Sequence, residues 1–207
     1  TVQSGAMLAA VARTAYQNGL TGLEFASGIP GPIGGAVVMN AGAYGGEMKH
    51  VLREVTVLTK EGEVLAIPAK ALELGYRTSV IPKNGWIVLG AVLQLKKGDP
   101  EQILARMEEL KEQRITKQPL DLPSAGSTFK RPEGYFAGKL IMDAGLRGFT
   151  VGGAQVSEKH CGFVVNRGNA TAADVWELIC EVKRRVKERT GVELEPEVKL
   201  LGDFPQR

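Results

Sequence analysis

The segment G-I-P-G-P-I-G-G-A, at residues 28–36, is the most informative part of this 207-residue sequence, and N-A-G-A-Y-G follows it at residues 40–45. No ordinary helix or strand continues through so many glycines, although a short helix could begin near Pro32, because proline suits a first helical turn. Backbone N–H groups that are free of side chains can wrap an anion or a flat ring. The segment matches neither the dinucleotide G-x-G-x-x-G fingerprint nor a P-loop. A cofactor or phosphate loop and a loop that is merely rich in turns therefore both stay open.

The composition is that of an ordinary globular protein except for its 26 glycines, which are close to twice average usage. The net charge of only +3 does not indicate a nucleic-acid partner, and it would suit a phosphorylated small ligand. Cys161 and Cys180 form no C-x-x-C pair and no metal spacing, which fits a reducing cytoplasm. No apolar run approaches membrane-spanning length, and no signal peptide is visible. The chain begins at Thr1 almost directly before a helical pattern, which we interpret as a truncation.

Apolar periodicity predicts helices, and these are expected at residues 6–17, 101–114, 136–144 and 172–190. Thr171 and Asp174 form a pattern like a capping box at the start of the last helix. Strand-forming runs are expected at residues 51–58, 64–67, 86–95, 162–166 and 192–201, the first two as a hairpin. The irregular mixture predicts an α+β fold. Residues 118–124 have the composition of a linker, so we place a domain boundary between residues 118 and 119.

The two glycine-rich motifs resemble the flavin-contacting segment of the UDP-N-acetylenolpyruvoylglucosamine reductase family, and similar stretches occur in FAD-binding oxidases of the vanillyl-alcohol-oxidase type. The resemblance implies FAD as cofactor. It also implies a partial FAD-binding domain at residues 1–118, without its N-terminal subdomain, and a C-terminal α+β substrate-binding domain at residues 119–207. The implied cofactor contacts are Gly28, Ile29, Pro30, Gly31, Gly34, Gly35, Ala36, Asn40, Ala41 and Gly42.

The motif G-Y-R-T-S at residues 75–79 contains a candidate catalytic arginine. Without context, Arg77 would be an ordinary solvated surface arginine. The resemblance implies instead that Arg77 belongs to the active site. Its guanidinium has a fixed charge and a forked shape, which suit the stabilisation of a carboxylate or an enolate.

Two further motifs supply candidate catalytic residues. In S-A-G-S-T-F-K-R-P, at residues 124–132, Ser127 would by itself be a turn residue, and the resemblance implies that it donates a proton. A hydroxyl can protonate an enolate-like carbon when its neighbours stabilise the alkoxide or relay a proton. In L-E-P-E-V, at residues 194–198, the alternative to catalysis is a charged edge strand. The resemblance selects Glu197 as catalytic and makes Glu195 the weaker candidate.

Candidate substrate contacts are also implied by the resemblance, and they are Tyr44, Arg114, Lys117, Lys130 and Gln155. Arg114 and Lys117 belong to an Arg-x-x-Lys-x-Pro element that would place Lys117 at the nucleotide-sugar phosphates. The run V-S-E-K-H-C-G-F-V-V-N at residues 156–166 is typical of the family's substrate-binding domain. His160 and Cys161 are neighbours whose side chains point apart on extended chain, so we expect a buried structural Cys161 and not a nucleophile.

The resemblance implies reduction of UDP-N-acetylglucosamine enolpyruvate to UDP-N-acetylmuramate by a flavin that NADPH reduces. It also implies a cytoplasmic, monomeric enzyme of peptidoglycan and cell-wall synthesis, and hence a part in cell shape, cell cycle and division, with neither nucleic acid nor membrane as partner. The sequence departs from the family at Arg131, where asparagine is frequent, and it lacks a tyrosine-bearing insertion, which indicates the shorter second type. The alternatives are an FAD-dependent oxidase of the same superfamily and a non-catalytic nucleotide-sugar-binding fragment. A nucleic-acid site at the basic residues 183–189 lacks an aromatic platform.

Overall fold

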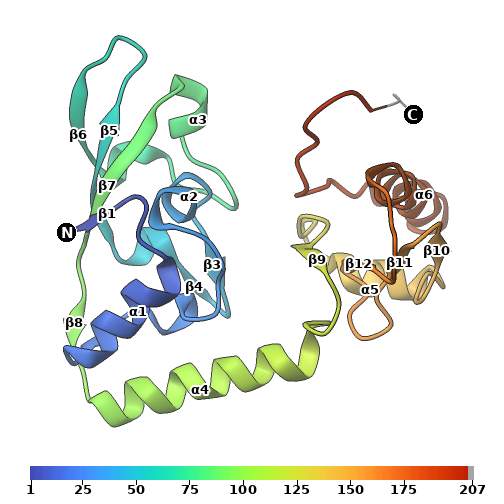
Figure 1. Ribbon diagram of the computed structural model, residues 1–207, viewed down its shortest axis with the longest axis horizontal. Coiled ribbons are helices and arrows are strands. Elements are labelled where there is room, and N and C mark those ends of the chain that lie inside the picture. The colour runs from blue at the N-terminus through green and yellow to red at the C-terminus, as the bar shows by residue number, and fades with distance from the viewer. Residues whose placement is uncertain (205–207) are drawn as a thin grey trace. The chain divides into compact units, whose positions relative to one another are not determined.

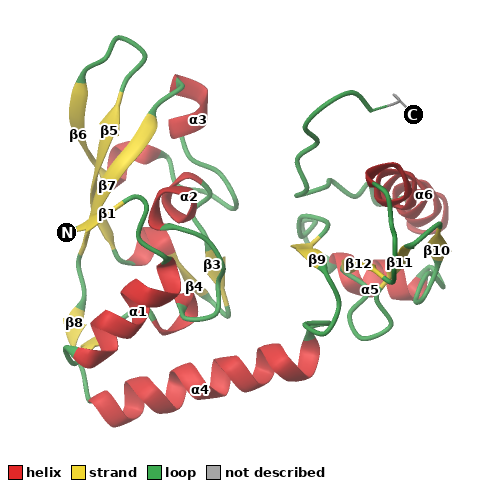
Figure 2. Cartoon of the chain, viewed as in Figure 1, coloured by secondary structure: helices red, strands yellow, loops and turns green. Residues whose placement is uncertain are grey.

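The computed structural model describes residues 1–204 and divides the chain into two compact units, Thr1–Arg114 and Ile115–Arg207. Both units combine helices with antiparallel strands (Figures 1 and 2), which confirms the predicted α+β class. Within residues 1–204, no helix has the length and apolar character that would let it cross a membrane.

The first unit is built on a four-stranded antiparallel sheet. Its strands, in spatial order, are β1 (Val2–Gln3), β7 (Ile87–Leu93), β5 (Leu52–Leu58) and β6 (Val64–Pro68). β5 and β6 form the predicted hairpin, in which Leu58 pairs with Val64. Alternate residues of β5 face the core, and Val55 and Val57 are fully buried there. Two short pairs complete the strands, β2 (Leu20–Thr21) with β8 (Lys96–Lys97) and β3 (Gly42–Ala43) with β4 (Gly46–Glu47).

Helices of the first unit bury apolar side chains in the same core as this sheet. The α-helices are α1 (Leu8–Gln17), α2 (Ile33–Val38) and α3 (Ile81–Asn84), and the 3₁₀ turns are η1 (Glu24–Ala26), η2 (Met48–His50) and η3 (Ala69–Leu72). α2 contacts β7 and buries Ile33 and Val37 completely. It is the short helix expected near Pro32, which is its N-cap. α4 (Pro100–Lys117) continues the predicted helix by three residues at its C-terminal end and buries Ile103 and Leu110.

The second unit contains a four-stranded antiparallel sheet covered by helices. The strands, in spatial order, are β10 (Thr150–Val151), β11 (Ala154–Val156), β12 (Phe163–Asn166) and β9 (Ser124–Ser127). The helices are α5 (Ala137–Asp143) and α6 (Ala172–Thr190). α6 packs on β10 and β11 and buries Leu178, Ile179, Val182 and Val186 completely. The capping box of Thr171 and Asp174 is present, as predicted.

The sequence-based prediction was wrong at two places in the second unit. Ser124, which we assigned to the end of a linker, begins β9. The strand expected at residues 192–201 does not form, and only Pro196 makes an isolated bridge there, to Phe129. Proline has no N–H group to donate, so a regular ladder cannot continue through Pro196.

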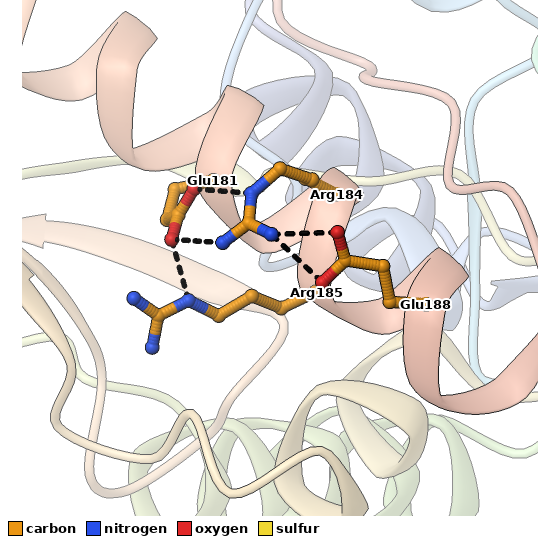
Figure 3. Close-up of polar contacts among 4 residues, drawn as sticks. All are labelled: Glu181, Arg184, Arg185 and Glu188. Atoms are coloured by element: carbon orange, nitrogen blue, oxygen red, sulfur yellow. Dashed lines mark hydrogen bonds and ion pairs between the residues drawn. The ribbon is translucent and has the colours of Figure 1, made fainter.

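Two arginines at the basic end of α6 pair with glutamates of the same helix (Figure 3). Arg184 lies 2.7 Å from a carboxylate oxygen of Glu181 and 2.6 Å from one of Glu188, and Arg185 also bonds to Glu181. Arg184 first, and then Arg185, lower the pKa of Glu181 to about 2. Ion pairs of this kind on a solvated helix surface contribute little to stability individually.

Candidate functional site

The glycine-rich segment is held in place by the first residues of the chain. The N–H of Leu8 donates to the carbonyl of Gly31 at 2.9 Å, and the N–H of Gly34 donates to the carbonyl of Ser4 at 2.8 Å. A Cβ atom added at Gly34 would lie 3.1 Å from the Cβ of Ser4, so the two backbones approach closely because residue 34 has no side chain. This packing fixes the entry into α2.

The outer side of the same segment is bare backbone. A Cβ atom added at Gly31 or Gly35 would meet nothing within 4 Å, and Gly35 is exposed. Gly31 has a φ of +112°, a region that favours glycine. The start of α2 therefore leaves room for a flat ring to approach the main chain, as the predicted cofactor requires.

The remaining candidate cofactor residues divide by exposure. Gly28 and Pro30 are exposed, and Ile29 packs partly against the core of the first unit. Ala36 and Asn40 are buried, so their side chains support the segment from inside. The other two contacts expected from the sequence, Ala41 and Gly42, are half-buried.

The G-Y-R-T-S motif folds onto the glycine-rich segment. A guanidinium nitrogen of Arg77 donates to the carbonyl of Gly42 at 2.9 Å. The amide of Asn40 donates to the carbonyl of Gly75 at 2.9 Å, and the buried hydroxyl of Ser79 donates to a carbonyl of α2 at 2.7 Å. Three links of this kind place the candidate catalytic arginine beside the candidate cofactor segment.

Arg114, Tyr44 and Gly28 form a second cluster in the first unit. The guanidinium carbon of Arg114 lies 5.6 Å from the centroid of the Tyr44 ring, within cation–π range. A Cβ atom added at Gly28 would lie 2.7 Å from the Nε atom of Arg114. The missing side chain at residue 28 therefore makes room for the arginine.

In the second unit, a backbone hydrogen bond joins Glu197 to the residue next to Ser127, although the two candidates are far apart along the chain. Ser127 ends β9 and pairs with Phe163. The next residue, Thr128, accepts a bond from the N–H of Glu197 at 2.8 Å and donates to the carbonyl of Gly162 at 2.8 Å. Ser127 is exposed, whereas Thr128 is buried. Glu197 is therefore bonded through its own N–H group to the residue that follows Ser127.

The neighbouring charged residues have different partners. Glu195 forms an ion pair with Lys130, and its carbonyl also accepts from the N–H of Lys130 at 2.8 Å. The amide nitrogen of Gln155 donates to the carbonyl of Gly148 at 3.1 Å. Lys117 is exposed at the end of α4. Glu195 thus has a structural partner in Lys130.

The geometry around Cys161 supports the expected structural role. Cys161 is buried, and burial raises the pKa of its thiol. The Nδ1 atom of His160 accepts a bond from the N–H of Gly162 at 3.1 Å, and the imidazole packs edge-on against Phe163. Burial also lowers the pKa of His160. Both shifts favour neutral forms, so the two residues do not make an activated nucleophile.

A cavity of ≈ 700 Å³ opens on α6, and none of the site residues expected from the sequence lines it. Trp176 and Phe149 supply its aromatic wall. Of its charged residues, Lys187 pairs with Glu193, and Arg184 pairs with Glu181. The charges of this cavity are thus largely satisfied by one another.

Comparison with known proteins places these features in a family. Residues 118–201 match the C-terminal domain of UDP-N-acetylenolpyruvoylglucosamine reductase, and residues 1–67 match an FAD-binding domain. The reductase of Clostridioides difficile is 55% identical over 98% of this chain and 67% of its own length. A crystal structure of the Thermus caldophilus reductase is 42% identical, with a TM-score of 0.82 over 94% of this chain and 70% of that one. The chain belongs to the UDP-N-acetylenolpyruvoylglucosamine reductase family.

The chain spans only part of its curated relatives in this reductase family. The reductase of Agathobacter rectalis is 61% identical over 204 residues, which are 99% of this chain but 65% of the relative. The glycine-rich segment lies in the matched FAD-binding region. Ser127 and Glu197 lie in the matched C-terminal reductase domain.

Two buried hydroxyls near the candidate catalytic residues were not predicted from the sequence. Ser79 and Thr128 are both buried and hydrogen-bonded, and each stands within two residues of a candidate catalytic residue. The available signal was a small polar residue inside a catalytic motif. That signal does not separate a supporting hydroxyl from a solvated one until the partner is known.

Proposed function

We propose that the protein is a flavoenzyme that reduces UDP-N-acetylglucosamine enolpyruvate to UDP-N-acetylmuramate with electrons from NADPH. The observation that supports this most is the hydrogen bond from Arg77 to the carbonyl of Gly42. It joins the candidate catalytic arginine to the segment that matches an FAD-binding domain. The names of the relatives supply the substrate class.

FAD would be held by the bare backbone of residues 28–36 and 40–42 and, when bound, would supply hydride chemistry that no side chain offers. The open space at Gly31 and Gly35 supports this assignment. Arg77 would then orient the carboxylate of the enolpyruvyl group. As negative charge develops on that group, the fixed guanidinium charge would stabilise it more strongly than it stabilises the substrate.

Ser127 would donate the proton that completes the reaction at C2 of the enolpyruvyl group. It is exposed at the end of β9, so its hydroxyl is accessible from solvent. Glu197 would stabilise the enolic species together with Arg77. The short backbone connection through Thr128 supports a joint role for Ser127 and Glu197.

Binding of the nucleotide sugar would use cationic and polar side chains. We assign Arg114 and Lys117, one helical turn apart on α4, to the diphosphate. Tyr44 would pack beside Arg114, and Lys130 and Gln155 would contact the substrate from the second unit. We further propose a boundary between residues 118 and 119, a monomeric state and a place in cytoplasmic cell-wall synthesis.

An FAD-dependent oxidase is the second candidate, because it would share the glycine-rich segment. It offers no role for Ser127, Lys117 and Glu197 together. A fragment that only binds nucleotide sugars is the third candidate. Both alternatives predict that the enolpyruvyl substrate cannot accept hydride from the reduced flavin.

Anaerobic stopped-flow spectroscopy of the full-length, FAD-loaded protein tests the proposal. NADPH should bleach the flavin absorbance, and UDP-N-acetylglucosamine enolpyruvate should then restore it without oxygen. Ser127→Ala should leave the bleaching rate near normal and slow the restoration by about 10²–10⁴-fold. Restoration by oxygen alone would support the oxidase, and binding of the substrate without restoration would support the binding fragment.

A further inference from the structure

Asn40 is the most completely engaged polar side chain of the first unit. It is fully buried, with a φ of +42°, a conformation that asparagine tolerates. Its Nδ2 atom donates to a carboxylate oxygen of Glu47 and to the carbonyl of Gly75, both at 2.9 Å. Its Oδ1 atom accepts from the N–H of Lys49 at 2.9 Å. Asn40 therefore joins three segments that are separate in the sequence.

One side of this connection is a fixed negative charge. Glu47 lies 2.8 Å from the ammonium of Lys49, and this contact, followed by the amide of Asn40, lowers the pKa of the Glu47 carboxyl group. Glu47 also forms a capping box with His50. Both partners of the Nδ2 atom, the carboxylate of Glu47 and the carbonyl of Gly75, are acceptors. The residue at position 40 must therefore donate two hydrogen bonds from one atom, as an amide does.

The other side of the connection is the turn that contains Arg77. Gly75 and Thr78 pair across this turn, and Arg77 has a φ of +53°, which is unfavourable for a side chain of its size. Such a conformation persists when the surrounding structure holds it. Here three hydrogen bonds hold it. Asn40 binds the carbonyl of Gly75, which precedes Arg77, and Ser79, which follows Arg77, binds a carbonyl of α2. The guanidinium itself binds the carbonyl of Gly42.

We propose that Asn40 is a positioning residue that holds the turn at residues 75–79 so that the guanidinium of Arg77 stays beside Gly42. Both N–H groups of its buried amide are already used, so the side chain acts through the turn and not by contact with a ligand. The catalytic consequence rests on the proposed function, because that function gives Arg77 its part in the reaction. The structural consequence does not.

Hydrogen exchange on the full-length protein tests the structural consequence. Asn40→Gly keeps a residue suited to positive φ and removes all three side-chain bonds. Exchange in peptides covering residues 72–80 should accelerate on the order of tenfold, because the carbonyl of Gly75 loses the side-chain donor that holds the turn. The matched control is Asn169→Gly, an exposed asparagine with a φ of +56°, which should leave these peptides unchanged. Unchanged exchange in Asn40→Gly would overturn the proposal.

A double-mutant cycle tests the catalytic consequence. Asn40→Gly should slow substrate-dependent flavin reoxidation on the order of tenfold in the wild-type background and have no further effect in Arg77→Ala. Equal slowing in both backgrounds would mean a general loss of structure and would contradict the proposal. If the wild type cannot be reoxidised by the substrate, the proposed function fails, and the exchange experiment alone decides the position of Asn40.

Asn40→Asp is the second variant, in case the glycine variant does not fold. It keeps the acceptor for the N–H of Lys49 and the shape of the side chain, but its ionised carboxylate cannot donate to Glu47 or Gly75. It should therefore accelerate exchange at residues 72–80 like Asn40→Gly. Protection equal to that of the wild type would show that the donor bonds of Asn40 do not hold the turn.

Discussion

The hydroxyl of Thr128 accepts a hydrogen bond where the pairing of β12 with β9 is irregular. The pairing of β12 with β9 shifts register between Phe163 and Val165, and the N–H of Val164 donates at 3.0 Å to the Oγ1 atom of Thr128. Thr128 is buried, so loss of this acceptor would leave the N–H of Val164 without its partner. Its hydroxyl thus stabilises the strand end at Ser127.

Replacement of Thr128 separates the hydroxyl from the side-chain shape. Thr128→Val should lower the free energy of unfolding by about 1–3 kcal/mol, because it buries a donor that has lost its acceptor. Thr128→Ser keeps the acceptor and should lie closer to the wild type. Urea denaturation of both variants is the measurement, and a valine variant as stable as the serine variant would remove the role of the hydroxyl.

Gly35 gives a prediction in which stability and binding move in opposite directions. It lies inside α2 with open space around its Cα atom. Gly35→Ala should raise the free energy of unfolding by about 0.5–1 kcal/mol, because alanine is the better helix former. The same methyl group should weaken FAD binding on the order of tenfold, which calorimetric titration of the full-length apoprotein would measure. Unchanged FAD affinity would place the flavin elsewhere.

Among the elements, α6 contains ion pairs whose contribution to stability depends on pH. Arg184 and Arg185 hold the pKa of Glu181 at about 2, below its ordinary value of 4.5. A lowered folded-state pKa stabilises the protein above pH 4.5, and this stabilisation is lost as the pH falls towards 2.

Glu181→Gln should therefore reduce the free energy of unfolding at pH 7 by about 0.2–1 kcal/mol, the range of solvent-screened ion pairs. The difference from the wild type should shrink as the pH falls from 4.5 towards 2 and should shrink with added salt. Thermal melts at several pH values measure it. Arg13→Gln, at an exposed position on α1, is a suitable control for loss of a charge elsewhere.

Long elements could be predicted from the sequence, and very short ones could not. The helices at 6–17 and 101–114 and the one capped by Thr171 were expected to within a few residues, because several turns repeat the apolar pattern. β10 and β11 have two and three residues, too few for any period, and they were missed. The strand wrongly expected at residues 192–201 was apolar and charged in alternation, but Pro196 outweighs that pattern.

The sequence predicted which motifs form the candidate site, but it did not predict which residues in them contact one another. The positions of Arg77 and Ser127 followed from a resemblance that covers whole motifs. The partners of Asn40 did not, because Glu47 and Gly75 come together only when two distant loops fold. Buried amides and hydroxyls are recognised by their partners, which a sequence does not name.

At the scale of the whole molecule, two separate sets of buried apolar residues form the cores. One contains Leu8 and Val55, and the other contains Ile141 and Leu178. A chain with two cores need not unfold in one step. A ligand that binds one unit stabilises that unit by mass action.

Leu178→Ala should therefore destabilise the second unit by about 2–5 kcal/mol, since the fully buried side chain leaves a cavity. Hydrogen exchange should accelerate in residues 137–190 and much less in the β5–β6 hairpin. FAD should add protection mainly to the first unit. Equal acceleration throughout would show that the two cores unfold as one.

The fit of Arg114 into the space above Gly28 links two positions that are remote along the chain. A methyl group at residue 28 would displace the guanidinium from the Tyr44 ring, although each residue alone is an unremarkable choice. Among related sequences, we expect any lineage that gains a side chain at position 28 to lose the arginine at position 114, or to have lost it first.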